Sequence, residues 1–171
     1  MAEDYGAELA RRYRKAVLTG SAMFALTALL VALAFGGVRP TPPDSLNSPV
    51  LRGALWFAIP FLGLGAIAIR RTRFAAPRLE AVAALRGVRG LLATLERTTT
   101  LVAALGGAIA VIGYALTLLT NDTTYMRNAA IVSIAVLFYG YPRRRAWQRV
   151  VEAVQQPDGL TGPAAAKGTT A

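Results

Sequence analysis

The sequence predicts an all-α integral membrane protein, a bundle of four helices built as two helical hairpins, with amphipathic helices on the cytoplasmic side. Of its 171 residues, 54% are hydrophobic, and the mean hydropathy is +0.44. That is more apolar sequence than a single soluble domain usually carries. The apolar residues also form four blocks without charge, and basic residues flank these blocks. A soluble helical core would not need basic clusters at alternate ends of its apolar blocks, so we favour a membrane bundle.

The four blocks predict membrane helices over residues 16–38, 50–69, 98–120 and 126–142. About 20 residues of helix are needed to cross a hydrocarbon core of about 30 Å, so the second and fourth charge-free blocks, 53–69 and 128–142, are short on their own. Arg52 and Arg127 precede these short blocks, and an arginine there can extend its guanidinium to the headgroups while its stem stays apolar. Tyr139 and Tyr141 are expected in the aromatic belt at the opposite interface. We favour anchoring by the two arginines over the alternative, a ring of charge that attracts anions at an outer mouth.

The distribution of basic residues predicts the orientation. Lysine and arginine gather in 11–15, 70–97 and 143–149, whereas only Arg39 and the two anchoring arginines lie on the other side. Under the positive-inside rule both termini and the central loop are cytoplasmic, in the plasma (inner) membrane, next to anionic headgroups. The first block exceeds the roughly 7–15 apolar residues of a signal peptide, so we expect it to be retained and not cleaved.

Two cytoplasmic amphipathic helices are expected within a single membrane domain, residues 1–157. Leucine and valine recur every three or four residues in 77–96, although Gly87 and Gly90 weaken this helix. It either lies on anionic lipid or packs against the bundle as a connector, and we favour the connector. The second, 143–156, places Trp147 on its apolar side as an interface anchor. The tail, 158–171, is rich in small residues and is predicted to be disordered.

Small residues mark one face of each long membrane helix. The first carries Ser21, Ala25, Ala28, Ala32 and Gly36, and the third carries Gly106, Ala110 and Gly113, followed by Thr117. Such stripes let helix backbones approach closely in a bilayer. We favour packing of these two helices against each other over a homodimer face.

The residue types present exclude most catalytic chemistry. The chain has no histidine and no cysteine, and the apolar blocks contain no ionisable side chain apart from tyrosine. Proton relays, nucleophilic catalysis and metal or cofactor ligation normally need such groups, so we expect neither an enzyme nor a bound cofactor or metal. The net charge of +10 is accounted for by topology and anionic lipid, so nucleic acid is not an expected partner.

The sequence therefore favours a non-catalytic accessory or scaffolding subunit of a membrane complex, with a protein partner or self-association in the membrane. The alternative is a small oligomeric channel or carrier. That alternative depends on Pro60, Gly63 and Gly65, which together would loosen or break the second helix.

Overall fold

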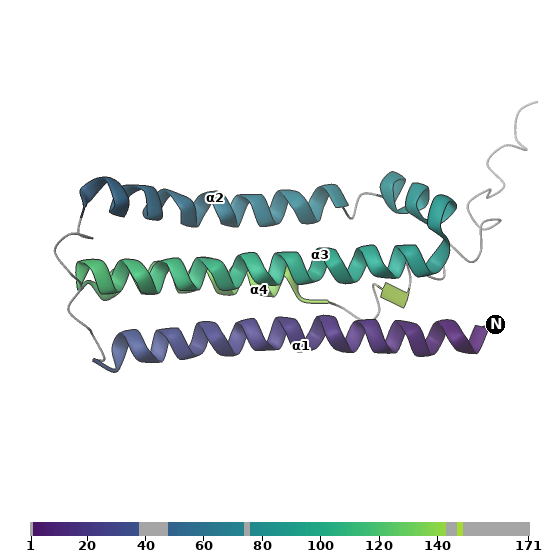
Figure 1. Cartoon of the computed structure of the whole chain (residues 1–171), viewed down its shortest axis with the longest axis horizontal. Coiled ribbons are helices and arrows are strands. Elements are labelled where there is room, and N and C mark those ends of the chain that lie inside the picture. The colour runs from purple at the N-terminus through teal and green to yellow at the C-terminus, as the bar shows by residue number, and fades with distance from the viewer. Residues whose placement is uncertain (1, 38–47, 74–75, 143–146, 149–171) are drawn as a thin grey trace, which may run out of the picture.

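A computed structural model of the chain describes residues 2–37, 48–73, 76–142 and 147–148. Its elements are α1 (Ala2–Phe35), α2 (Pro49–Arg73), α3 (Ala76–Thr120) and α4 (Thr123–Gly140), which pack as a bundle (Figure 1). This confirms the predicted all-α four-helix fold. The predicted tail, 158–171, and most of the predicted helix 143–156 lie outside the described residues. We call the end where α1 begins the Trp147 end, and the end where α3 turns into α4 the Asn121 end.

Helix α1 begins well before the apolar block that predicts it. Leu9 and Tyr13 lie one turn apart and pack, together with Ala16, against α3 and Trp147. Because this amphipathic segment has its own packing surface, the helix extends toward the N-terminus beyond the membrane block. It ends before Gly37, whose φ of 81° is the left-handed conformation common just after a helix.

Helix α2 begins at Pro49, a favourable first helical residue because its missing N–H would be unpaired there in any case. The helix continues through Pro60, which lies on an exposed face, to its last turn. That turn carries Arg70, Arg71 and Arg73, and positive charge is favourable at the carboxyl end of a helix.

Helix α3 contains a sharp change of direction at Gly87. Its backbone angles, φ 63° and ψ −174°, are not helical, and the segment before it turns away from the rest of α3 beside the end of α2 (Figure 1). The predicted amphipathic helix 77–96 is therefore not one separate element. Its second half runs without interruption into the predicted membrane helix, because Leu91, Leu92 and Leu95 are buried inside the bundle.

A tight turn connects α3 to α4. Asn121 takes the left-handed conformation, with φ 55°, and asparagine tolerates this better than most residues. The Asp122 carboxylate then accepts a hydrogen bond of 2.8 Å from the backbone N–H of Thr124, which caps the first turn of α4. The polar turn predicted between the third and fourth helices thus has a specific structural role.

Helices α3 and α4 form the centre of the bundle. Each packs on both α1 and α2, while α1 and α2 make few contacts with each other among the described residues (Figure 1). One core cluster joins α2 to α3 and α4 around Ile59 and Ile109, and another joins α1 to them around Ala34 and Ala110. The arms of the first predicted hairpin are thus separated in space by the second hairpin.

Three helical segments are long and apolar enough to cross a bilayer: Gly6–Phe35, Pro49–Arg73 and Gly90–Thr120. The chain is thus an integral, multi-pass membrane protein. Helix α4 has 18 residues and runs antiparallel to α3 along the bundle.

Candidate functional site

Glycines allow α3 and α4 to approach closely. A Cβ atom placed on Gly113 would overlap the Cβ of Ala129, and one placed on Gly106 would lie 2.8 Å from the Cγ of Leu137. Ala110, between these glycines in the sequence, is fully buried. The structure therefore places the small-residue stripe of α3 in the interior of the bundle, where it faces α4 and α1.

Two buried hydroxyls connect three helices at the level of this contact. Thr27 on α1 and Ser133 on α4 lie with their Oγ atoms 3.2 Å apart, and the Ser133 hydroxyl is 2.8 Å from the carbonyl oxygen of Gly106 on α3. Thr27 is also 2.9 Å from the carbonyl oxygen of Met23 on its own helix. Each hydroxyl carries one hydrogen, so the two together can make only two of these three contacts as hydrogen bonds at one time. Each hydroxyl can therefore always donate, while the remaining contact has no proton between its two oxygen atoms.

The small residues of α1 lie on its outer face. Ser21, Ala25, Ala28, Ala32 and Gly36 are all exposed. Helix α1 instead packs through its opposite face, where Thr27 and Ala34 are buried and Met23 lies against Gly107 of α3. A Cβ on Gly107 would be 2.6 Å from the Met23 sulfur, so the small residue at this contact belongs to α3 and not to α1.

An aromatic pair closes the bundle at the Trp147 end. The Trp147 ring is only 2% exposed and meets the ring of Tyr13 edge-on, with centroids 5.9 Å apart. The Tyr13 hydroxyl donates to the carbonyl oxygen of Pro142 at 3.3 Å, which holds the segment after α4 against α1. The sequence predicts Trp147 as a membrane-interface anchor, whereas the structure places its side chain among Leu91, Leu92 and other core residues.

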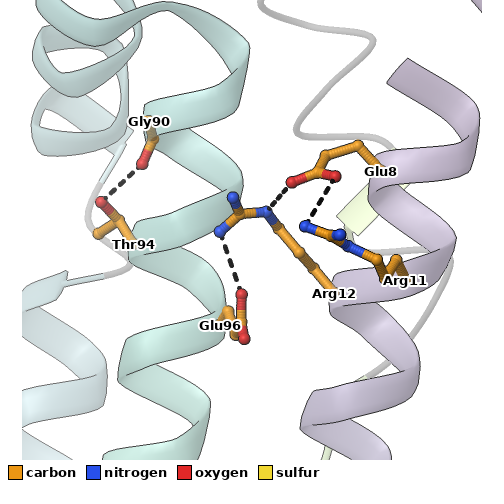
Figure 2. Close-up of polar contacts among 6 residues, drawn as sticks. All are labelled: Glu8, Arg11, Arg12, Gly90, Thr94 and Glu96. Atoms are coloured by element: carbon orange, nitrogen blue, oxygen red, sulfur yellow. Dashed lines mark hydrogen bonds and ion pairs between the residues drawn. The ribbon is translucent and has the colours of Figure 1, made fainter. Parts of the chain in front are cut away.

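An ion-paired arginine joins α1 to α3 at the same end (Figure 2). Nε of Arg12 is 2.6 Å from Glu8 on its own helix, and its Nη1 is 3.1 Å from Glu96 on α3. The Arg12 and Glu96 side chains are 22% and 25% exposed, respectively, so water screens this pair only in part. Arg12 therefore bridges two carboxylates that are 88 residues apart along the chain. The negative charge of Glu96 is thus paired with the positive charge of Arg12 inside the bundle.

The other predicted anchors lie near the two ends of the bundle. Arg52 is partly buried and Arg127 is exposed, both near the Asn121 end, while Tyr139 and Tyr141 are 46% and 39% exposed at the Trp147 end. The guanidinium of Arg70 stacks over the Tyr139 ring, 4.4 Å from its centroid, in a cation–π contact. Charge patterning alone does not predict this pairing, although an arginine and a tyrosine at the same end of neighbouring helices are consistent with it.

The described residues offer little reactive chemistry. In these parts of the chain, no group of three or more histidine, cysteine, aspartate or glutamate side chains could hold a metal ion. The pKa of Asp122 lies below its ordinary value, mainly because the carboxylate accepts the backbone N–H of Thr124, and Arg127 adds to this effect. This carboxylate is a helix cap in an exposed turn, so its lowered pKa has a structural cause.

Among models of known protein families, curated proteins and solved structures, none matches this chain. Its function is inferred from the surfaces and contacts of the four helices.

Proposed function

We propose that this protein is a non-catalytic accessory or scaffolding subunit that binds a transmembrane helix of another protein in a membrane complex. The observation that supports this best is the exposed small-residue face of α1, from Ser21 to Gly36. Lipid tails are as apolar as leucine, so helices associate in a bilayer mainly through close packing, which small side chains permit. Because α1 packs on its own bundle through the opposite face, this face remains available to a partner.

The buried polar groups support a role without catalysis. The hydroxyls of Thr27, Thr117 and Ser133 each lie within hydrogen-bonding distance of a backbone carbonyl. A hydroxyl becomes a nucleophile only beside a base, and no histidine occurs in the chain. Thr117 bonds within its own helix, while Thr27 and Ser133 join three helices, which is what a scaffold requires.

A small oligomeric channel or carrier is the second candidate, but its main argument is weakened. A carrier interpretation relies on a broken second helix, and α2 is continuous through Pro60. Gly63 is buried against α4, where a Cβ would lie 3.1 Å from Val132, so it has a packing role. Ion or solute flux in liposomes made with the purified protein would revive this candidate.

For topology we propose that α4 is a fourth crossing, with both termini and the Trp147 end in the cytoplasm, next to the anionic face of the plasma (inner) membrane. The arginines in the last turn of α2 and those of residues 11–14 at the start of α1 support this orientation. Because the chain has no cysteine, single cysteines report location directly. Thr123→Cys should react with an impermeant thiol reagent from outside intact cells and Thr72→Cys should not; the reverse result would contradict the proposal.

The proposed function is tested by a matched pair of variants. Ala28 on α1 and Ala135 on α4 are both exposed alanines on membrane helices, but only Ala28 belongs to the small-residue face. In mild detergent the unsubstituted protein should co-purify with another membrane protein. This partner should also co-purify with Ala135→Phe but should be absent from preparations of Ala28→Phe. Isolation of the unsubstituted chain as a lone monomer, or as a closed homo-oligomer that conducts ions, would refute the accessory role.

A further inference from the structure

The outer face of α3 carries a groove near the Trp147 end. Its lining residues are Ala93, Glu96, Arg97, Thr100, Leu101 and Ala104, and its volume is about 520 Å³. This volume lies within the range of about 300–1,000 Å³ that is typical of sites for small molecules. Arg97, Leu101 and Ala104 are exposed, so the groove opens on the outside of the bundle and not into its interior.

The position of the groove follows from the arrangement of the helices. With 100° between successive residues, Arg97, Leu101 and Ala104 lie on the opposite side of α3 from Gly106 and Gly113, which face α4. Helices α1 and α2 flank α3, as Figure 1 shows. Short side chains on this face leave space that larger residues would fill.

The charged residues of the groove lie in its part nearer the Trp147 end, and the part farther along α3 is apolar. Arg97 lies in the part of the groove nearer the Trp147 end, one turn from Ala93, and forms no ion pair with the residues that the structure describes. Its neighbour Glu96 is already paired with Arg12, so it does not neutralise Arg97. Leu101 and Ala104 line the deeper part, one to two turns farther into the apolar segment of α3.

We propose that this groove binds one phospholipid, with the lipid phosphate at Arg97 and an acyl chain along Leu101 and Ala104. A positive side chain above an apolar surface complements an anionic headgroup above its hydrocarbon chain. The same end of the bundle carries Arg70, stacked on Tyr139, which is consistent with the headgroup level of a membrane. An anionic phospholipid such as phosphatidylglycerol fits this arrangement best.

The test is native mass spectrometry of the delipidated full chain in detergent, titrated with phosphatidylglycerol. Two variants alter the groove: Arg97→Gln removes the charge, and Ala104→Phe fills the apolar part. Two controls match them: Arg11→Gln removes an arginine that is 67% exposed at the same end, and Ala135→Phe adds an aromatic ring on an exposed face of α4. Circular dichroism of each variant shows whether the helices still form.

We expect one tightly retained lipid on the unsubstituted protein and on both controls. Arg97→Gln should bind it about fivefold more weakly, the effect of one arginine near an anionic surface. Ala104→Phe should lose this first lipid; if that variant does not fold, the comparison of Arg97→Gln with Arg11→Gln decides the result. Diacylglycerol, which lacks a phosphate, should bind the unsubstituted protein and Arg97→Gln equally.

Three results would overturn the proposal. The first is equal phosphatidylglycerol affinity in all folded variants, which would mean non-selective lipid adhesion. The second is displacement of the lipid by inorganic phosphate alone, which would indicate a free-anion site. The third is a dimer that forms in place of the lipid adduct and is lost in Ala104→Phe. This result would show that a second copy of the chain occupies the groove.

Discussion

Replacing Gly113 by alanine should separate the two central helices of the bundle. The added Cβ would overlap the Cβ of Ala129, which is attached directly to the backbone of α4 and has no rotamer that moves it away. The backbones of α3 and α4 must therefore shift apart. At Gly106 the nearest atoms are Cγ and Cδ2 of the Leu137 side chain, which can change rotamer, so alanine there should do less harm.

The expected loss can be worked out from two opposing terms. Forcing an extra methyl group into a packed interior costs about 1–3 kcal/mol. Replacing glycine by alanine inside a helix returns about 0.5–1 kcal/mol. We therefore expect Gly113→Ala to lower the free energy of unfolding by about 1 kcal/mol, and by at most about 2.5 kcal/mol. Gly65→Ala is the control, because a Cβ there meets nothing within 4 Å, and it should leave stability unchanged or raised.

The assay is unfolding in detergent, followed by circular dichroism, with a double-mutant cycle. Ala129→Gly removes the methyl group that Gly113→Ala would strike, so the double variant should be more stable than the sum of the two single effects predicts. If Gly113→Ala proves as stable as Gly65→Ala, or if the two substitutions simply add, the close contact of α3 and α4 at this position is refuted.

Three further outcomes follow from the polar contacts. Thr27→Val and Ser133→Ala should each cost only about 0.6 kcal/mol, because the hydroxyl that remains still has a carbonyl to donate to; a loss of several kcal/mol in thermal unfolding would contradict this. Glu96→Gln should weaken the link to Arg12 by less than about 1 kcal/mol, and the difference from the unsubstituted chain should shrink as salt rises. The pKa of Asp122 is lowered in the folded chain, so the ionised cap stabilises α4 fully at pH values above 3.8, the ordinary pKa of this carboxyl group. This stability is lost as the pH falls through the lower pKa of the folded state. Asp122→Asn should remove that acid-dependent loss in a pH series of melting curves, and an unchanged pH profile would contradict the assignment.

Charge and polar patterns predicted the elements of this fold well, because they follow from the solvent. Apolar blocks bounded by arginine gave the membrane helices, since charge is costly in hydrocarbon. The polar residues between Thr120 and Thr123 gave the turn, since Asn121 and Asp122 favour the backbone conformations that it needs. Such local preferences do not depend on which helices become neighbours.

The direction in which each helix faces could not be predicted in the same way. Periodicity finds a small-residue face on α1, but lipid and protein interior are equally apolar, so hydrophobicity does not tell which of the two this face meets. Ala28 and Trp147 illustrate this difficulty. Ala28 was expected inside and is exposed, while Trp147 was expected at the membrane interface and is buried against Tyr13. In each case the deciding partner is distant in sequence.

The distribution of burial shows where the functional surfaces of this protein lie. Half of the most apolar stretch of α3 is buried, against 17% of the corresponding stretches of α1 and α2. Helix α3 thus uses glycines such as Gly106 to hold α4, while the flanking helices present most of their surface outward. The buried hydroxyls that join the helices, Thr27 and Ser133, bond to each other and to backbone carbonyls. Recognition by this bundle is therefore expected on its outer faces, the small-residue face of α1 for a protein helix and the groove on α3 for a lipid.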